Sequence, residues 1–164
     1  ESGSVARASI VLLQNEIPPE INLVAARAAR NAGATVLWNA APMRKDTERF
    51  IGLVDLLIVN AVEAEQFCGQ KVGSLEEAER AARRLCSDGT NTIVTAGAAG
   101  CAWATKEGDL GALPAEPVKE ANAHGAGDVF CGALAARLVE RSLRESLAFA
   151  MAKAHRHVSG LPLV

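Results

Sequence analysis

Short apolar runs alternate with helical patterns along most of this 164-residue chain, and this alternation restricts its fold more than any other feature. A short, continuous apolar run is typical of a strand buried in a parallel sheet. The chain has such runs at residues 8–13, 34–38, 55–59 and 91–95. The alternation predicts a mostly parallel sheet with helices on both faces, joined by right-handed crossovers. We therefore expect one three-layer α/β/α domain over residues 1–164.

The expected helices begin and end at recognisable signals. Pro18 and Pro19 open a helix that Gly33 ends, since proline is favoured at the first helical position and glycine just after the last. The apolar stripe of this helix consists of Ile21, Val24, Ala25, Ala28 and Ala32. A capping box at residues 74–77 predicts a helix over 75–85. Two more helices are expected at 128–140 and 143–157, and an antiparallel hairpin at 101–105 and 110–113.

Composition and charge argue against several classes of protein. The net charge of −2 offers no basic surface for nucleic acid, and no apolar run has the length of a membrane-spanning helix. The N-terminus lacks the pattern of a signal peptide. The four cysteines form no Cys-x-x-Cys pair and no zinc spacing with the three histidines, and we interpret His155 and His157 as surface residues. We expect a soluble, cytoplasmic protein with reduced thiols.

The residues Gly125-Ala126-Gly127-Asp128 lie directly before a helical pattern. Small residues let a ligand approach the backbone closely, and the N–H groups at a helix start attract anions, above all phosphate. A carboxylate beside such a site suits a base that takes a proton from a hydroxyl about to attack the phosphate. The structural alternative is that Gly-x-Gly is a common turn and that aspartate is favourable in any first helical turn.

Polar or glycine-rich groups follow each of the four expected strands. They are Glu16, Asn39, Asn60 with Glu63, and Thr95 with Gly97 and Gly100. Ligands of open α/β sheets bind at the carboxyl ends of the strands, so these groups are expected to converge with the turn at 125–128. Each group also has a structural interpretation: turn asparagines, a solvated first helical turn for Glu63, and a hairpin loop for the two glycines.

Three motifs, in this order, resemble those of the ribokinase-like (PfkB) carbohydrate kinase family. Residues 60–63 match Asn-x-x-Glu, residues 95–100 match Thr-x-Gly-x-x-Gly, and residues 125–130 match Gly-Ala-Gly-Asp-x-Phe. Residues 39–42 and 14–16 resemble segments of the ribokinase branch of this family. The resemblance implies a Rossmann-type α/β/α domain that forms the nucleotide and phosphoryl-transfer part of such a kinase and lacks its N-terminal portion.

The resemblance also implies ATP-dependent phosphorylation of a sugar hydroxyl, with ribose as the first choice of sugar. Asp128 would be the base and would contact the substrate together with Glu16. The turn from Gly125 would form an anion hole from the N–H groups of Ala126, Gly127 and Asp128. Glu63 would hold Mg²⁺ through water. The nucleotide-binding residues would be Asn60, Thr95, Gly97, Gly100 and Gly127.

This sequence departs from the family at two places. Asn122 and Ala123 stand where family members carry Asp-Thr, so Asn122 would offer a potassium ion a carbonyl oxygen but no charge. The family's sugar-binding aspartate, Gly-Gly motif and β-sheet lid have no counterpart in this chain. We therefore expect little or no kinase activity from this chain alone, an exposed apolar surface, and a homo-oligomer. The alternative is a catalytically silent, truncated homologue that binds nucleotide or a partner protein, although the retained Asp128 and Glu63 favour the kinase.

Overall fold

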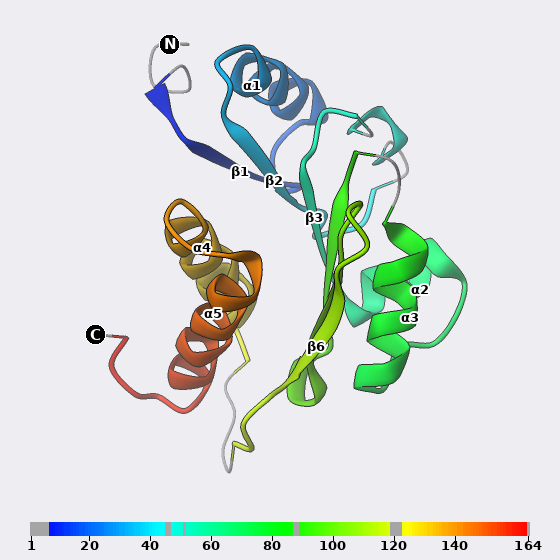
Figure 1. Cartoon of the computed structure of the whole chain (residues 1–164), viewed down its shortest axis with the longest axis vertical. Coiled ribbons are helices and arrows are strands. Elements are labelled where there is room, and N and C mark those ends of the chain that lie inside the picture. Colours follow the sequence, from blue (N-terminus) through cyan, green and yellow to red (C-terminus); the bar gives the residue numbers. More distant parts are fainter. Residues whose placement is uncertain (1–6, 45–46, 51, 87–88, 119–122, 164) are drawn as a thin grey trace.

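A computed structural model describes residues 7–44, 47–50, 52–86, 89–118 and 123–163 of the chain (Figure 1). The strands are β1 (Ile10–Gln14), β2 (Thr35–Asn39), β3 (Leu56–Asn60), β4 (Asn91–Thr95), β5 (Gly100–Ala104) and β6 (Leu110–Pro114). The α-helices are α1 (Pro19–Asn31), α2 (Ala61–Cys68), α3 (Leu75–Leu85), α4 (Ala126–Leu138) and α5 (Leu143–Val158). Two short 3₁₀ helices are η2 (Thr47–Phe50) and η3 (Gly97–Ala99).

The strands lie in the sheet in chain order, from β1 at one end to β6 at the other. β1 to β4 are parallel, and β5 and β6 continue the sheet as an antiparallel hairpin. The predicted mostly parallel sheet and the predicted hairpin are thus confirmed. Because the four parallel strands run in the same direction, their carboxyl ends meet at one edge of the sheet. The last residues of these strands are Gln14, Asn39, Asn60 and Thr95.

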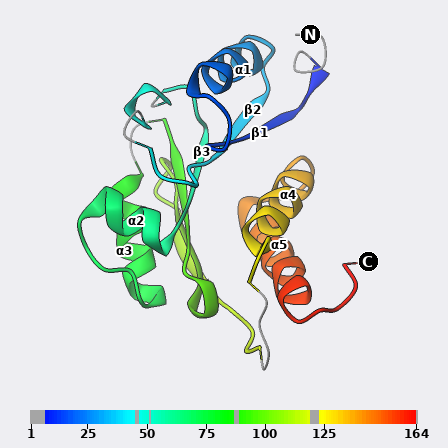
Figure 2. The ribbon, with the colours of Figure 1, turned by 180° about the vertical axis from the view of Figure 1, so that it is seen from behind.

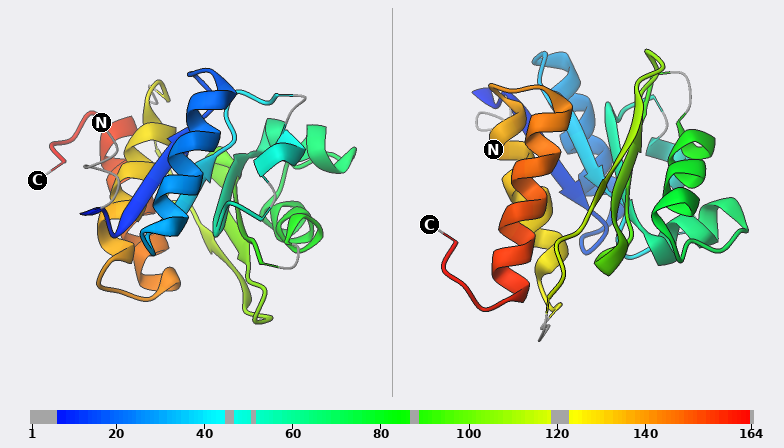
Figure 3. Two further views of the ribbon diagram at one scale, coloured as in Figure 1. Left: turned by 90° about the horizontal axis from the view of Figure 1, so that it is seen from above. Right: turned by 60° about the horizontal axis from the view of Figure 1, so that its bottom comes forward.

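Helices cover both faces of the sheet, as the sequence predicts. Figures 1 and 2 show α4 and α5 on one side and α2 and α3 on the other, and the views in Figure 3 show the same layers. Successive strand side chains point to opposite faces, so Val36 and Trp38 join the core beneath α1 to α3, while Leu37 joins the core beneath α4 and α5. None of the helices in the described part of the chain has the length and apolar character needed to cross a membrane.

Helix α1 packs on the sheet through a different face from the apolar stripe seen in the sequence. Ala26 and Ala29 are buried, whereas Ile21 is 56% exposed and Val24 is 68% exposed. The buried face also contains Asn22, whose Nδ2 donates to the carbonyl oxygen at the end of β1 at 2.6 Å. The alanines allow close approach to the sheet and the asparagine satisfies a strand-end carbonyl. Leu23 is the large apolar residue of α1 on this buried face, whereas Ile21 and Val24 point outward.

Helix α2 was anticipated only through the structural alternative that placed Glu63 in a first helical turn, and its length was not predicted. Its sequence directly follows β3, with Asn60 as both the last strand residue and the N-cap of the helix. Gly69 ends α2 in the left-handed conformation that glycine tolerates best. The helix has only eight residues, too short to give a clear periodic pattern. It nevertheless places Glu63 one turn beyond the strand end.

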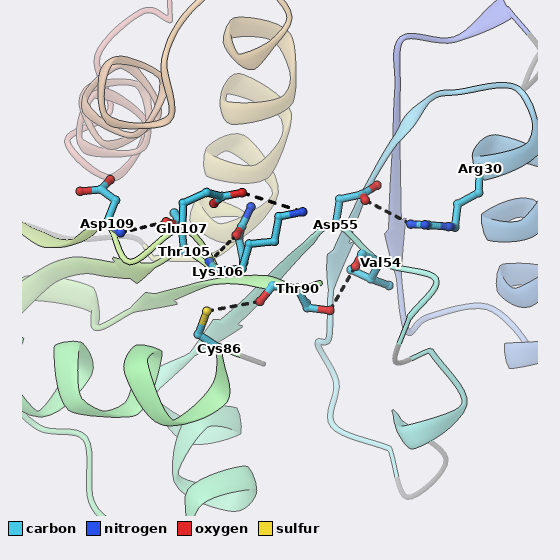
Figure 4. A network of polar contacts seen from close by, with 10 residues as sticks. Arg30, Val54, Asp55, Cys86, Thr90, Thr105, Lys106, Glu107 and Asp109 are labelled. Carbon is cyan, nitrogen blue, oxygen red and sulfur yellow. Dashed lines mark hydrogen bonds and ion pairs between the residues drawn. The ribbon is translucent and has the colours of Figure 1, made fainter. Parts of the chain in front are cut away.

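Polar contacts also secure the opposite, amino-terminal ends of the strands (Figure 4). Asp55, just before β3, accepts hydrogen bonds from Val36 N at 2.8 Å and from Arg30 Nη1 at 3.1 Å. Thr90, just before β4, donates its hydroxyl to Val54 O at 3.2 Å. These bonds satisfy backbone groups where the ladders begin. The polar groups at the carboxyl ends of the strands are thereby the ones left to line a ligand site.

Candidate active site

A cavity of about 480 Å³ lies at the carboxyl ends of the parallel strands, between them and the start of α4. It brings together most of the site residues expected from the sequence. Those that line it are Glu16, Asn39, Asn60, Glu63, Thr95, Gly125, Gly127 and Asp128. The cavity is also lined by Ile58, Val59, Phe130 and Cys131, which sequence reasoning missed. The position of Cys131 one turn after Asp128 was the available signal for that residue.

The start of α4 is set by Gly125. This residue has a φ of 75°, in the left-handed region where a side chain is strained, and it caps the helix. The helix therefore begins at Ala126, two residues earlier than predicted. Asp128 is the third residue of the helix and is exposed, so its carboxylate lies in the first turn, as expected.

The backbone N–H groups of this first turn are not all free. Ala126 N donates to Ala123 O at 3.2 Å, and the first helical bond runs from Val129 N to Gly125 O at 3.0 Å. Within the described residues, the N–H groups of Gly127 and Asp128 have no protein acceptor. In this structure two N–H groups, rather than the three expected, are available to an anion beside the Asp128 carboxylate.

Asn60 and Glu63 form a reciprocal capping box at the start of α2. Glu63 N donates to Asn60 Oδ1 at 3.0 Å, and Asn60 N donates to Glu63 Oε2 at 2.7 Å. Asn60 Nδ2 also donates to Glu63 Oε1, at 2.8 Å. Glu63 is only 6% exposed, so the interpretation of it as a solvated first-turn residue is wrong. The carboxylate of Glu63 is oriented by two of these hydrogen bonds, one to each oxygen, and both oxygens keep further acceptor capacity.

The cavity has a negative electrostatic character. Among the residues that the structure describes, three carboxylates line it, those of Glu16, Glu63 and Asp128, and no lysine or arginine does. Burial raises the pKa of the Cys131 thiol to about 12, and the charges of Asp128 and Glu63 add to this effect. Among the described residues, no three His, Cys, Asp or Glu side chains are grouped so that they could hold a metal by themselves. A polyphosphate would therefore need a cation to enter this site, bound partly by the phosphates themselves.

The glycine-rich loop after β4 contributes less to the cavity than the sequence suggested. Thr95 lines the cavity, whereas Gly97 and Gly100 do not. Gly100 has a φ of 122°, and a Cβ there would lie 2.1 Å from Leu113 O on β6. Its missing side chain thus makes room for β6. The nucleotide-binding roles expected of Gly97 and Gly100 remain predictions. Asn122, the candidate potassium ligand, lies outside the described residues.

The two C-terminal histidines are half-buried, so they lie at the surface as expected, but each also contacts another part of the chain. His157 Nε2 donates to His124 O at 2.8 Å, and His155 Nε2 lies 3.6 Å from Glu116 Oε2. The last turns of α5 therefore contact the segment directly before Gly125. Only the tertiary structure brings these residues together, because more than thirty residues separate His157 from His124.

Comparison with known proteins agrees with this geometry. The family model described as pfkB family carbohydrate kinase matches residues 2–159. Mus musculus ribokinase is 36% identical over 134 residues, which cover 80% of this chain and 42% of that protein. Lactococcus lactis ribokinase is 34% identical over 153 residues, which cover 92% of this chain and 48% of that protein.

Solved structures give the same result. The structure of Arabidopsis thaliana ribokinase complexed with ribose and ATP matches with a TM-score of 0.83 and 29% identity. The match covers 96% of this chain and 52% of that one. This chain thus spans about half the length of the relatives that it matches. With its motifs converging on one cavity and a family model matching nearly all its residues, the chain belongs to the pfkB family of carbohydrate kinases.

Proposed function

We propose that the full-length protein transfers a phosphoryl group from ATP to a hydroxyl of a small sugar, with ribose as the first candidate. The observation that carries this proposal is the start of α4, where the Asp128 carboxylate and two N–H groups without protein acceptors meet one cavity. A related protein, Arabidopsis thaliana ribokinase, has been solved in complex with ribose and ATP. The candidate sugar contact Glu16 lines the same cavity.

In the proposed reaction, Asp128 accepts the proton of the sugar hydroxyl as its oxygen bonds to the terminal phosphorus of ATP. The bond between that phosphorus and the bridging oxygen breaks, and ADP leaves. Negative charge spreads over the oxygens of the transferring group. The N–H groups of Gly127 and Asp128, at the positive end of α4, stabilise that charge because they are already oriented toward it.

The residues of the cavity fit a magnesium ion that enters with the nucleotide. Glu63 is a buried carboxylate held in place by Asn60, and the described part of the chain places no basic side chain in the cavity wall to neutralise the phosphates. Mg²⁺ commonly binds through one or two carboxylates together with substrate phosphates, and it retains several waters. When bound, the ion would neutralise phosphate charge. Glu63 would hold it through water.

Glu63→Gln should raise the Mg²⁺ concentration for half-maximal ADP formation about tenfold or more in the full-length protein, since residues that orient metal ligands typically matter to this extent. Glu145→Gln is the matched control, because Glu145 occupies the equivalent position of the capping box at Ser142 but is exposed. The Glu145→Gln variant loses the same kind of capping interaction, but Glu145 is not a candidate for binding the metal. An equal change in the Mg²⁺ requirement of both variants would contradict the assignment of Glu63.

The proposed activity is tested by incubating full-length protein with ATP, Mg²⁺ and a panel of sugars and measuring ADP. We expect ADP formation that depends on the sugar. Nucleotide binding without turnover on any sugar would instead favour the catalytically silent homologue. The 164-residue chain alone should show weak activity or none, because only Gln14, Glu16 and Asn39 of its β1 and β2 strand ends offer polar groups to a sugar.

An exposed apolar surface occurs where the sheet ends, as the sequence led us to expect. β1 is the terminal strand of the described sheet, and Ile17, Ile21 and Val24, which lie just before or on the neighbouring helix α1, are exposed large apolar residues. Edge strands with apolar neighbours pair readily with other chains. We propose that the 164-residue chain self-associates through this surface.

Ile21→Glu should therefore shift the 164-residue chain from dimer or larger species toward monomer in sedimentation velocity experiments. Val62→Glu is the control, because Val62 is similarly exposed, at 61%, but lies on α2. The proposed self-association would be contradicted if the unsubstituted chain were monomeric. It would also be contradicted if the two substitutions shifted the chain toward monomer to the same extent.

A further inference from the structure

Asn15, directly after β1, makes three hydrogen bonds inside the protein with its side-chain amide, using both N–H donors and the oxygen. It is only 4% exposed. Its Nδ2 donates to Ala40 O at 3.0 Å and to Pro42 O at 2.9 Å, and its Oδ1 accepts from Trp38 Nε1 at 3.1 Å. The indole nitrogen only donates and the carbonyls only accept, so the partners determine which way the amide points.

These bonds continue the connection between β1 and β2 beyond the end of their ladder. The last paired residues of the two strands are Gln14 and Asn39. Past that point, Asn15 N donates to Ala41 O at 3.0 Å, and the Asn15 side chain binds the carbonyls on either side of Ala41. One asparagine thus holds the segment after β1 against the segment after β2.

Every segment that Asn15 joins contributes to the wall of the cavity. Its two chain neighbours, Gln14 and Glu16, line the cavity, and so do Asn39, Ala41 and Pro42. Asn15 itself does not line the cavity. Its position beneath the wall means that it can set the relative placement of cavity groups without touching a ligand.

The third partner, Trp38, is itself fixed. Its ring stacks on Phe50, with ring centroids 4.4 Å apart and an angle of 23° between the rings. Trp38 is 3% exposed and Phe50 is 1% exposed. The indole N–H therefore has one direction available to it, and that direction determines where the Asn15 oxygen must lie. Asn15 thus connects the cavity wall to the packed core beneath α1 to α3.

We propose that Asn15, anchored by Trp38, is a positioning residue that sets Glu16 and Asn39 for the substrate that this side of the cavity receives. With regard to sugar, this inference rests on the proposed function. The proposed phosphoryl-transfer groups at Asp128 and Glu63 belong to other elements, α4 and α2, and the three side-chain hydrogen bonds of Asn15 run to neither helix. Loss of Asn15 should therefore weaken the binding of the sugar and leave the binding of the nucleotide largely unchanged.

The two tryptophans of the chain offer a matched test. Trp38→Phe keeps the ring stacked on Phe50 and removes the donor to Asn15. Trp103→Phe removes an equivalent donor, because Trp103 is also 3% exposed and its Nε1 donates to Asp109 Oδ2 at 2.9 Å. Each substitution should lower Tm by a few degrees, since each leaves an acceptor without its partner. Only Trp38→Phe should change the cavity.

In full-length protein, Trp38→Phe and Asn15→Ala should raise the KM for the sugar about tenfold, with the KM for ATP within about twofold of its original value. Trp103→Phe should leave both values unchanged. If Trp103→Phe raised the KM for the sugar equally, the effect would come from lost stability, and the positioning role of Asn15 would be overturned. An unchanged sugar KM in folded Trp38→Phe or Asn15→Ala protein would also overturn the positioning role.

A second measurement needs no activity and so separates this inference from the proposed function. In spectra of the ¹⁵N-labelled 164-residue chain, the two indole N–H resonances are assigned from the one that each of the variants Trp38→Phe and Trp103→Phe loses. Asn15→Ala should speed hydrogen exchange of the Trp38 indole N–H, leave that of Trp103 unchanged, and shift the amide resonances of Glu16 and Asn39. If protein without sugar-dependent turnover shows these changes, only the proposed function fails. Unchanged exchange and unchanged resonances would overturn the role of Asn15.

Discussion

Asp128→Asn should lower kcat for sugar-dependent ADP formation by about 10²–10⁴-fold in the full-length protein, the range typical of a lost general base. The physical reason is that asparagine has nearly the same shape and still permits the helix start, but its amide cannot accept the proton of the sugar hydroxyl. The N–H groups of Gly127 and residue 128 would remain in place. Nucleotide affinity should therefore change by about twofold or less, as expected for an interaction needed only in the transition state.

The measurement is steady-state kinetics on the sugar that gives turnover, together with calorimetric titration of ADP. Glu140→Gln is the control, since it removes an exposed carboxylate just beyond the far end of α4. It should leave both quantities unchanged. Turnover by Asp128→Asn equal to that of the unsubstituted protein would remove Asp128 from the base role and leave it as an ordinary first-turn residue of α4.

Gly100→Ala should reduce the free energy of unfolding by about 3–5 kcal/mol, a large share of the stability of a typical domain. Two effects combine. The φ of 122° is strained for any residue with a side chain, and the new Cβ would lie 2.1 Å from Leu113 O and 2.9 Å from Ala115 N. Those contacts are with backbone atoms, so relief requires β6 to move away from β5.

The measurement is urea unfolding of the 164-residue chain, followed by circular dichroism. Gly97→Ala is the control from the same loop: its φ is 53°, and a Cβ there would meet no atom within 4 Å. It should cost only about 1–2 kcal/mol, the usual cost of a left-handed residue. If Gly100→Ala had near-normal stability but bound ATP more weakly, the packing role would be contradicted. The nucleotide role that the sequence motif suggested for Gly100 would then be supported.

Most of the architecture could be predicted from local patterns. The strand at 91–95 and the helix at 75–85 have the bounds that the sequence indicated, because an apolar run and a capping box are local signals. The face of α1 that packs against the sheet could not be predicted. Its sequence carries more than one row of small or apolar residues, and Asn22 is buried only because a strand-end carbonyl lies within reach.

For the candidate site too, some features could be predicted from the sequence and others could not. Asp128 and Glu63 were identifiable because their chemistry and their spacing to neighbouring residues are local properties. The true neighbours of Gly100 were not identifiable, since β6 approaches it only in the folded sheet. Asn15 was seen in sequence only as one residue of a polar strand end. Its partners Trp38, Ala40 and Pro42 lie more than twenty residues away.

The sequence by itself thus determined the order of the strands along the chain, the parallel sheet, and the charged groups that are candidates for the site. These follow from periodicity and residue chemistry within short windows. Only the tertiary structure decided that Gly100 packs against β6, which face of α1 is buried, and which carbonyls the Asn15 side chain binds. Those outcomes depend on contacts between segments distant in the chain, where close packing and buried hydrogen bonds, rather than local propensity, set the free energy.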